Sequence, residues 1–397
     1  MLTVVRNARL VQDGLVSPCD LVAEDGVVVS IGGPGSASGR GDVVVDAQGL
    51  YLSHGFVDIH VHGGGGHDFM DATEEAWHGA ARLHLTHGTT ALLPTTLASS
   101  TGELLDAFAM YRHCRGRFAD GAKLAGLHIE GPYLAPGQAG AQDPAYLRRP
   151  DPVEYLRLLD ACSDIRRWTI APELEGAAQL GDELARRGIL ASIGHSDATY
   201  DQVCEALRHG YRHVTHLYSA TSTIVRRQGF RFPGIVESAY LLPALTSEII
   251  ADGCHLPAPL LQMAYRFLGA DRLALVTDAM RAAGQTGGES ILGSLRKGQP
   301  VVLEDGVAKM PARNAFAGSI ATADRLVRTM VEQGGATLAD AVKMVTETPA
   351  RIVGLGREMG RLAPGRRADA VLFDETIRVA CVLTDGQVRW QTADHWL

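Results

Sequence analysis

Eight short apolar or β-branched runs, separated by segments of helical character, occupy the middle of this 397-residue chain. Amphipathic stretches such as Asp151–Cys162 and Tyr200–His209 lie between them. A strand followed by a helix, repeated eight times, predicts an α/β fold of the (β/α)8 barrel type over residues 54–355. The eight runs are Phe56–Val61, Thr90–Thr95, Lys123–Ile129, Trp168–Pro172, Ile189–Gly194, His213–His216, Leu245–Ala251 and Leu273–Thr277.

The first run ends in two histidines, His60 and His62, within F-V-D-I-H-V-H. Because side chains alternate between the two faces of a strand, both imidazoles project to the same side, close enough to bind one metal ion. Alone, this pair is weak evidence, since two alternating histidines can arise by chance in a chain with 15 of them.

Further potential ligands follow the later runs, at the end of the barrel where such folds place their chemistry. Glu130 follows the third run, His195 the fifth, His216 the sixth, His255 lies beyond the seventh, and Asp278 follows the eighth. A random scatter of histidines and acids would not respect strand ends in this way. We therefore expect a metal site, in preference to a set of core or loop residues with ordinary hydrogen-bond partners.

Two of these residues have simpler explanations that the sequence leaves open. Asp278 could be the N-cap of a helix beginning in D-A-M-R-A-A, and D-G-x-H could be an ordinary turn that carries a surface histidine, His255. Their positions at strand ends favour catalytic roles.

The two chain ends differ from the middle. Residues 1–53 alternate in short strands with Gly-rich turns, and residues 356–397 return to the same pattern, with strand pairs joined by D-G turns. We expect the two ends to meet in a small β-sandwich domain beside the barrel.

Charge and composition limit the classes of binding partner and the cellular location that we expect. A formal net charge of −8 and a pI near 6.0 give no electrostatic case for nucleic acid, although local basic patches could bind an anionic ligand. The N-terminus lacks a signal pattern, and no long apolar run suggests a membrane span. The six cysteines lack C-x-x-C spacing, which is typical of reduced thiols. These observations predict a cytoplasmic protein without membrane contact.

Taken together, the motifs resemble those of the amidohydrolase superfamily and, within it, the N-acetylglucosamine-6-phosphate deacetylase family. The resemblance covers nearly the whole chain and is specific only in combination, because the H-x-H and D-G-x-H pieces are individually weak. The motifs are G-F-V-D-I-H-V-H-G at 55–63, H-I-E-G-P-Y-L at 128–134, A-P-E at 171–173, G-H-S-D-A-T-Y at 194–200, T-H-L-Y-S-A at 215–220, A-D-G-C-H at 251–255, V-T-D-A-M at 276–280 and F-A-G-S at 316–319.

The resemblance implies Glu130, His195 and His216 as ligands of a principal metal ion, with His60 and His62 available for a second one. Some family members lack the histidine pair and use one metal, so the resemblance implies one or two divalent ions. Mixed imidazole and carboxylate ligands favour zinc or iron. Hydantoinases and dihydroorotases bridge their metals with a modified lysine, and the glutamate at this strand end argues against them.

Such a site suits amide hydrolysis. A bound divalent ion lowers the pKa of water toward about 7, and Asp278 would accept the proton. The metal and His255 would stabilise the developing oxyanion, and Asp278 would return the proton to the leaving amine.

The substrate-binding motifs match the family less well. The resemblance implies Gln142, Ser219, Ala220, Arg227 and Arg231 as substrate contacts, but Gln142 stands where the family has a phosphate-binding histidine and cannot carry positive charge. Ser219 replaces an asparagine.

The loop at residues 221–234 is several residues longer than in the family, and its role is open. Arg231 matches an arginine that reaches a neighbouring subunit's phosphate, which implies a homodimer, whereas a solvated basic loop explains the arginines equally well.

The expected activity is deacetylation of an amino-sugar phosphate, either N-acetylglucosamine 6-phosphate or an epimer such as N-acetylgalactosamine 6-phosphate. Two alternatives remain. A hydrolase or deaminase acting on a different acylated amine or C–N bond, without phosphate, would keep every ligand. A non-catalytic scaffold should have lost ligands or the general base, and this chain retains them.

Overall fold

A barrel of eight parallel strands forms the centre of the protein in the computed structural model, which describes residues 1–37 and 41–393. Hydrogen bonding runs from the first strand to the last in sequence order, and the amide of Asp278 donates to the carbonyl of His60 (2.8 Å), which links the two ends of the barrel. The barrel strands are β6 (Phe56–Val61), β9 (Thr89–Thr96), β11 (Leu127–Glu130), β12 (Ile165–Ile170), β13 (Leu190–Ile193), β14 (Tyr211–Val214), β17 (Thr246–Ile250) and β18 (Leu273–Val276). The predicted (β/α)8 fold is confirmed.

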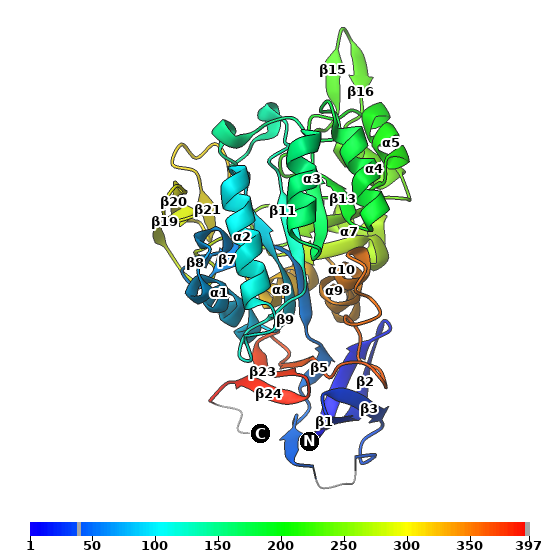
Figure 1. Cartoon of the computed structure of the whole chain (residues 1–397). Coiled ribbons are helices and arrows are strands. Elements are labelled where there is room, and N and C mark those ends of the chain that lie inside the picture. Colours follow the sequence, from blue (N-terminus) through cyan, green and yellow to red (C-terminus); the bar gives the residue numbers. More distant parts are fainter. Residues whose placement is uncertain (38–40, 394–397) are drawn as a thin grey trace.

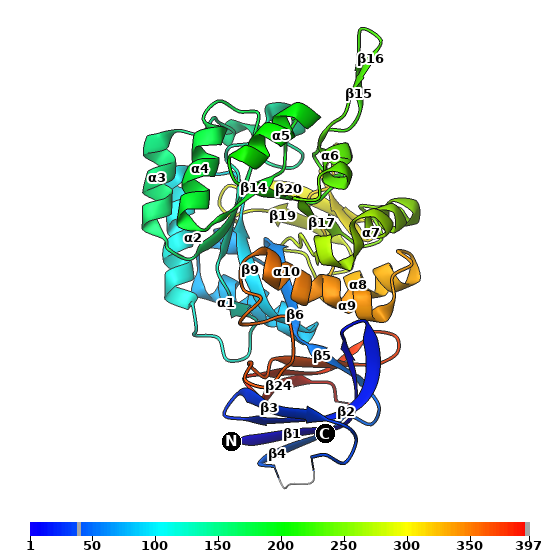
Figure 2. The ribbon, with the colours of Figure 1, turned by 90° about the vertical axis from the view of Figure 1, so that its right-hand side faces the viewer.

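Helices surround the barrel on its outer side (Figures 1 and 2). Every residue of β6 and β9 is buried, as expected for strands enclosed between a barrel interior and a layer of helices. The helices are α1 (Glu74–Thr86), α2 (Thr101–Cys114), α3 (Pro152–Ala161), α4 (Ala177–Arg187), α5 (Tyr200–Arg208), α6 (Ile235–Leu241), α7 (Ala258–Arg272), α8 (Ala323–Glu332), α9 (Leu338–Val345) and α10 (Glu347–Ile352), with 3-10 turns at Phe69–Asp71, Pro136–Gln138 and Pro144–Tyr146.

Local sequence explains where these helices begin and end. The hydroxyl of Ser100 accepts from the amide of Glu103, whose carboxylate accepts in return, so a capping box starts α2. Asp151 caps α3, with Pro152 in the first helical position. Gly188 ends α4 in the left-handed conformation (φ 71°) that glycine adopts without steric cost.

The two chain ends meet in one β-rich unit at one end of the barrel (Figure 1). Its single sheet branches at β1, which pairs with β4 through residues 3–6 and with β5 through residues 9–10, and β22 joins β5 antiparallel. Buried apolar side chains from both ends form its core. The strands are β1 (Leu2–Gln12), β2 (Leu15–Glu24), β3 (Val27–Gly32), β4 (Val43–Asp46), β5 (Tyr51–His54), β22 (Ala370–Phe373), β23 (Val379–Thr384) and β24 (Gln387–Gln391). The domain boundaries at 53/54 and 355/356 stay a prediction.

Smaller sheets lie at the end of the barrel opposite the terminal sheet. The longer loop forms a hairpin, β15 (Val225–Arg227) with β16 (Phe230–Phe232), that projects away from the terminal sheet in both views (Figures 1 and 2). A three-stranded sheet follows β18, made of β19 (Gly288–Leu292), β20 (Gln299–Glu304) and β21 (Val307–Lys309), and short strands β7 (Gly63–Gly64), β8 (His67–Asp68) and β10 (Lys123–Leu124) complete the fold. No helix in the described part of the chain is long and apolar enough to cross a membrane.

Candidate metal centre and active site

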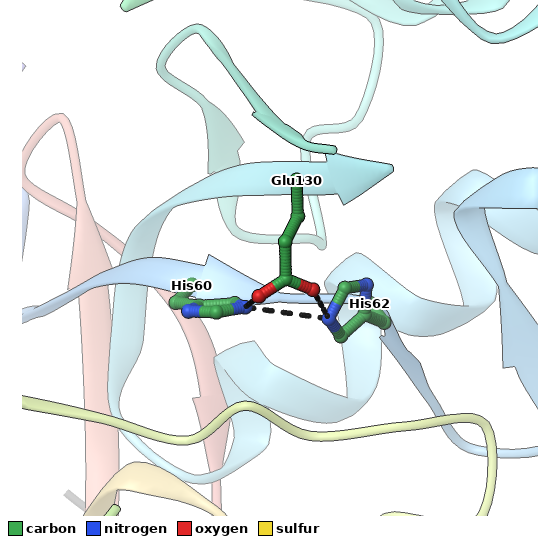
Figure 3. Close-up of side chains that lie close together, drawn as sticks. All are labelled: His60, His62 and Glu130. Carbon is green, nitrogen blue, oxygen red and sulfur yellow. Dashed lines mark hydrogen bonds and ion pairs between the residues drawn. The ribbon is translucent and has the colours of Figure 1, made fainter. Parts of the chain in front are cut away.

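The site lies at the carboxyl ends of the barrel strands. His60 and His62 project to the same side of β6, as their alternation predicts, with their Nε2 atoms 3.3 Å apart (Figure 3). Glu130, at the end of β11, lies between them. Its Oε1 is 3.4 Å from Nε2 of His60, and its Oε2 is 3.3 Å from Nε2 of His62.

A second pair of histidines shares the same carboxylate. His195 follows β13 and His216 follows β14, and their Nε2 atoms are 3.2 Å apart. Both face Oε1 of Glu130, at 3.3 Å for His195 and 3.0 Å for His216. Each pair and Glu130 therefore offer three ligand atoms within 4.8 Å of one another. The structure brings all five predicted ligands together as two groups that share one glutamate.

All four histidine rings are anchored through the nitrogen that faces away from this cluster. Each Nδ1 has a partner, so each Nε2 is left to face the centre, an arrangement typical of metal-binding histidines. The partners are the Glu248 carboxylate for His60, and backbone carbonyls of Thr95 for His62, Gln138 for His195 and Ser219 for His216.

Strained backbone positions three of the site residues. His195, His216 and Asp278 have φ values of 48°, 28° and 45°, in the left-handed region that residues with a Cβ rarely adopt. Such conformations cluster at functional sites, where the surrounding structure stabilises them. Here the sharp turn directly after each strand directs these side chains over the barrel mouth.

The charges of the cluster suit a cation. Burial alone would lower the pKa values of His60 and His62, but Asp278 and Glu130 raise them to about 10 and about 9. Burial would likewise raise the pKa of Glu130, but His60 and His195 hold it well below its ordinary value. Two buried carboxylates thus need positive compensation, and a divalent ion bound by imidazole and carboxylate ligands supplies it. The residues present therefore fit a divalent metal.

Asp278 and His255 face the same cavity, of about 530 Å³. Oδ1 of Asp278 lies 3.4 Å from Nε2 of His60 and 3.2 Å from Nε2 of His62, and no helix begins at this residue, which removes the N-cap explanation. The imidazole of His255 is also buried, and its Nδ1 lies 2.8 Å from Oδ2 of Asp252. His255 is therefore not a surface histidine.

The predicted substrate contacts separate into two groups. Ser219, Ala220 and Gln142 line the cavity. The structure brings neither Arg227 nor Arg231 to the cavity of their own chain, because both are exposed on the projecting hairpin.

Sequence reasoning missed a buried ion pair beneath the site. Glu248 on β17 accepts from both terminal nitrogens of Arg167 on β12, and the same carboxylate holds Nδ1 of His60 at 2.8 Å. Two charged residues at the predicted runs were the available signal, Glu248 inside Leu245–Ala251 and Arg167 directly before Trp168–Pro172, since buried charges occur in proteins when paired. Asp252, which orients His255, stood within the A-D-G-C-H motif but had no role assigned.

The model of the amidohydrolase family matches residues 51–390 of this chain. The chain belongs to the amidohydrolase family. Members of this family typically depend on divalent metal ions. The two groups of histidine and glutamate ligands at the barrel mouth agree with this.

Similar proteins cover almost the full length of this amidohydrolase. The N-acetylglucosamine-6-phosphate deacetylase of Lysinibacillus sphaericus is 36% identical over 396 residues (98% of each chain). The N-acetylgalactosamine-6-phosphate deacetylase of Escherichia coli O157:H7 is 32% identical and covers 98% of this chain and 99% of that one. The crystal structure of the Mycobacterium smegmatis N-acetyl-D-glucosamine-6-phosphate deacetylase superposes with a TM-score of 0.87 at 32% identity, over 98% of this chain and 99% of that chain.

Proposed function

We propose that the protein is a metal-dependent deacetylase that hydrolyses the N-acetyl amide of an amino-sugar phosphate to acetate and the free amine. The observation that carries this proposal is the single cavity in which Asp278 and His255 face two ligand groups sharing Glu130. The names of the similar proteins support N-acetylglucosamine 6-phosphate or its galactosamine epimer as the substrate.

Asp278 is the proposed general base and acid. A divalent ion bound to the cluster would lower the pKa of water and polarise the amide carbonyl. Burial would raise the pKa of Asp278, but His60 and His62 lower it below its ordinary value, so its carboxylate is ionised at neutral pH. It can therefore accept the proton of the attacking water and return it to the departing amine.

His255 is the proposed oxyanion partner. The carboxylate of Asp252 accepts a hydrogen bond from Nδ1, which fixes the orientation of the ring. When Nε2 also carries a hydrogen, it can donate to the oxyanion as it develops on the acyl carbon.

We further propose one or two zinc or iron ions as the cofactor. His195, His216 and Glu130 form the principal group, and His60, His62 and Glu130 form the second. Mixed imidazole and carboxylate ligands suit both metals.

The substrate's phosphate needs a cationic side chain from outside the cavity in which the substrate binds. Among the described residues, those that line the cavity include no lysine or arginine. Arg231 lies on a hairpin that also exposes Phe230 (71%), an apolar side chain that contact with another protein surface would bury. We propose a homodimer in which this hairpin brings Arg231 to the partner's phosphate, where a forked guanidinium binds well.

A second candidate is hydrolysis of a different acylated amine or C–N bond without phosphate. The uncharged lining of the cavity beyond the catalytic cluster favours it. A cytoplasmic location also stays a prediction, with which the six free cysteines are compatible.

The deciding experiment measures acetate and ammonia release by metal-analysed protein from matched phosphorylated and unphosphorylated N-acetylhexosamines. We expect acetate, with the 6-phosphorylated sugars preferred, and loss of turnover after chelation that zinc or iron restores. Equal hydrolysis of unphosphorylated sugars would contradict the sugar-phosphate substrate, and ammonia release would indicate a deaminase.

A further inference from the structure

Gln142 is held at both ends of its side-chain amide. The residue is buried, with 5% of its surface exposed, and its Oε1 accepts from the backbone N–H of Ala98 at 2.8 Å. Its Nε2 lies 2.7 Å from Oε2 of Glu130. Because a backbone N–H can only donate, the amide oxygen must face Ala98 and the amide nitrogen must face Glu130. The orientation of this side chain is therefore determined by its partners.

This contact makes the two oxygens of Glu130 unequal. Oε1 faces the pair of His195 and His216, and Nε2 of His60 lies farther from it, at 3.4 Å, whereas Oε2 faces His62 and also accepts the N–H of Gln142. A carboxylate oxygen that already accepts a strong hydrogen bond donates less electron density to a cation, and the bond also fixes the plane of the carboxylate.

We propose that Gln142 is a positioning residue of the metal centre, which directs Glu130 toward the His195 and His216 group and weakens the second group at His60 and His62. Gln142 thereby increases the difference in affinity between the two metal-binding groups. The inference rests on the metal centre of the proposed function, and it gives Gln142 a role different from the substrate contact expected from the sequence.

The position of Gln142 in the fold supports this role. Ala98 follows β9 and Glu130 ends β11, two neighbouring strands of the barrel, so the amide of Gln142 connects their carboxyl ends. Glutamine also carries no charge, so it restrains the glutamate without adding to the buried charge of the cluster and without titrating.

The test compares stepwise zinc affinities of the full-length protein and Gln142→Leu, measured by competition with a chromogenic chelator, and zinc content by elemental analysis. We expect the tighter site to weaken by roughly 10- to 100-fold, as for other residues that support metal ligands, while the weaker site holds or gains affinity. The two stepwise zinc affinities of the variant should therefore be more similar than those of the wild type. If the wild-type protein binds a single ion, the variant should bind that ion more weakly.

Gln299→Leu is the matched control, because Nε2 of Gln299 donates to the carbonyl of Ala141 (2.7 Å) beside Gln142 but touches no ligand. It should bind zinc like the wild type. Gln142→Met repeats the test if the leucine variant does not fold.

Equal weakening of both sites, or unchanged constants, would overturn the inference. Acetate release by the same wild-type preparation tests the proposed function separately. If the wild type is active but Gln142→Leu does not change the zinc affinities, only the inference on Gln142 is refuted. Wild-type protein that binds no divalent ion would refute both.

Discussion

Asp278 shows how the backbone can direct a single side chain into the candidate site. It follows the last barrel strand, adopts a left-handed φ of 45°, and is tied on both sides, through its amide to the carbonyl of His60 and through its own carbonyl to the amide of Ser319. These bonds direct the carboxylate at Nε2 of His60 and His62. Backbone strain that the neighbouring strands stabilise is typical of a functional position.

Asp278→Asn should separate metal binding from catalysis. Asparagine preserves the shape of the side chain but cannot accept the proton, so turnover should fall by at least roughly 10²- to 10⁴-fold while zinc content stays near that of the wild type. Acetate release and elemental analysis on the same sample check this.

His195→Ala is the control that removes a ligand, and it should lose the principal ion. Near-normal turnover in Asp278→Asn would refute the proposed mechanism.

At this scale the sequence predicted the residues whose chemistry is visible in the strand-end pattern. His60, His62, Glu130, His195 and His216 meet at one centre as expected. The supporting contacts were not predictable, because hydrogen bonds between distant strands depend on register and rotamer. Glu248 is 188 residues from His60, and Gln142 resembled a substrate contact until its buried bond to Glu130 was seen.

Among the elements, the barrel strands were predicted because each is an apolar run with turn or helical signals on either side, and such runs form strands buried on both faces. The hairpin β15–β16 was not predicted. Its strands have three residues each, are exposed, and contain Arg226, Arg227 and Arg231 among apolar residues, so neither length nor alternation identifies them.

Helix α1 supports a prediction on pH. Its residue His84 is fully buried, and Nε2 lies 2.9 Å from the carbonyl of Gly63 in β7. Burial lowers the pKa of His84 from 6.5 to about 4. The unfolded chain therefore takes up this proton at a higher pH than the folded chain, so the stability due to neutral His84 is complete above pH 6.5 and is lost as the pH falls toward 4. The loss is about 3 kcal/mol.

His84→Gln keeps a donor for Gly63 but does not titrate. Compared with the wild type, its melting temperature should fall less between pH 6.5 and 4, measured by thermal denaturation in one buffer series. His213, also buried with a pKa lowered to about 4, is unchanged in both proteins and cancels in the comparison. Parallel pH profiles for the two proteins would show that His84 does not contribute.

On the scale of the whole molecule, the terminal sheet and the hairpin lie at opposite ends of the barrel (Figure 2). The candidate active site opens at the hairpin end, since its predicted metal ligands follow the carboxyl ends of the strands. A second copy approaching this end would meet the exposed apolar and cationic side chains of the hairpin. Sequence could supply the arginines but not their separation from their own cavity, because that depends on the direction in which the hairpin projects.

Arg231→Ala therefore tests whether the site is completed between two copies. The variant should raise KM for the phosphorylated N-acetyl sugar more than it lowers kcat, because contacts remote from the amide are shared by the ground and transition states. A charge-assisted bond contributes about 1.5–3 kcal/mol, which corresponds to roughly ten- to a hundred-fold in KM. Arg226→Ala, on the facing strand of the same hairpin, is the matched control with an equal loss of charge.

Co-expression of Arg231→Ala with Asp278→Asn then distinguishes contact within a chain from contact between chains. A mixed dimer has one complete site, formed by the Asp278 of one chain and the Arg231 of the other. Because about half of the dimers are mixed and each has one complete site of two, the whole sample should show about a quarter of the wild-type activity at low substrate concentration. If Arg231 acts on its own cavity, every chain in the mixture carries one defect and no activity returns. If Arg231→Ala alone leaves KM unchanged, the phosphate is bound by other groups, and the hairpin serves a different purpose.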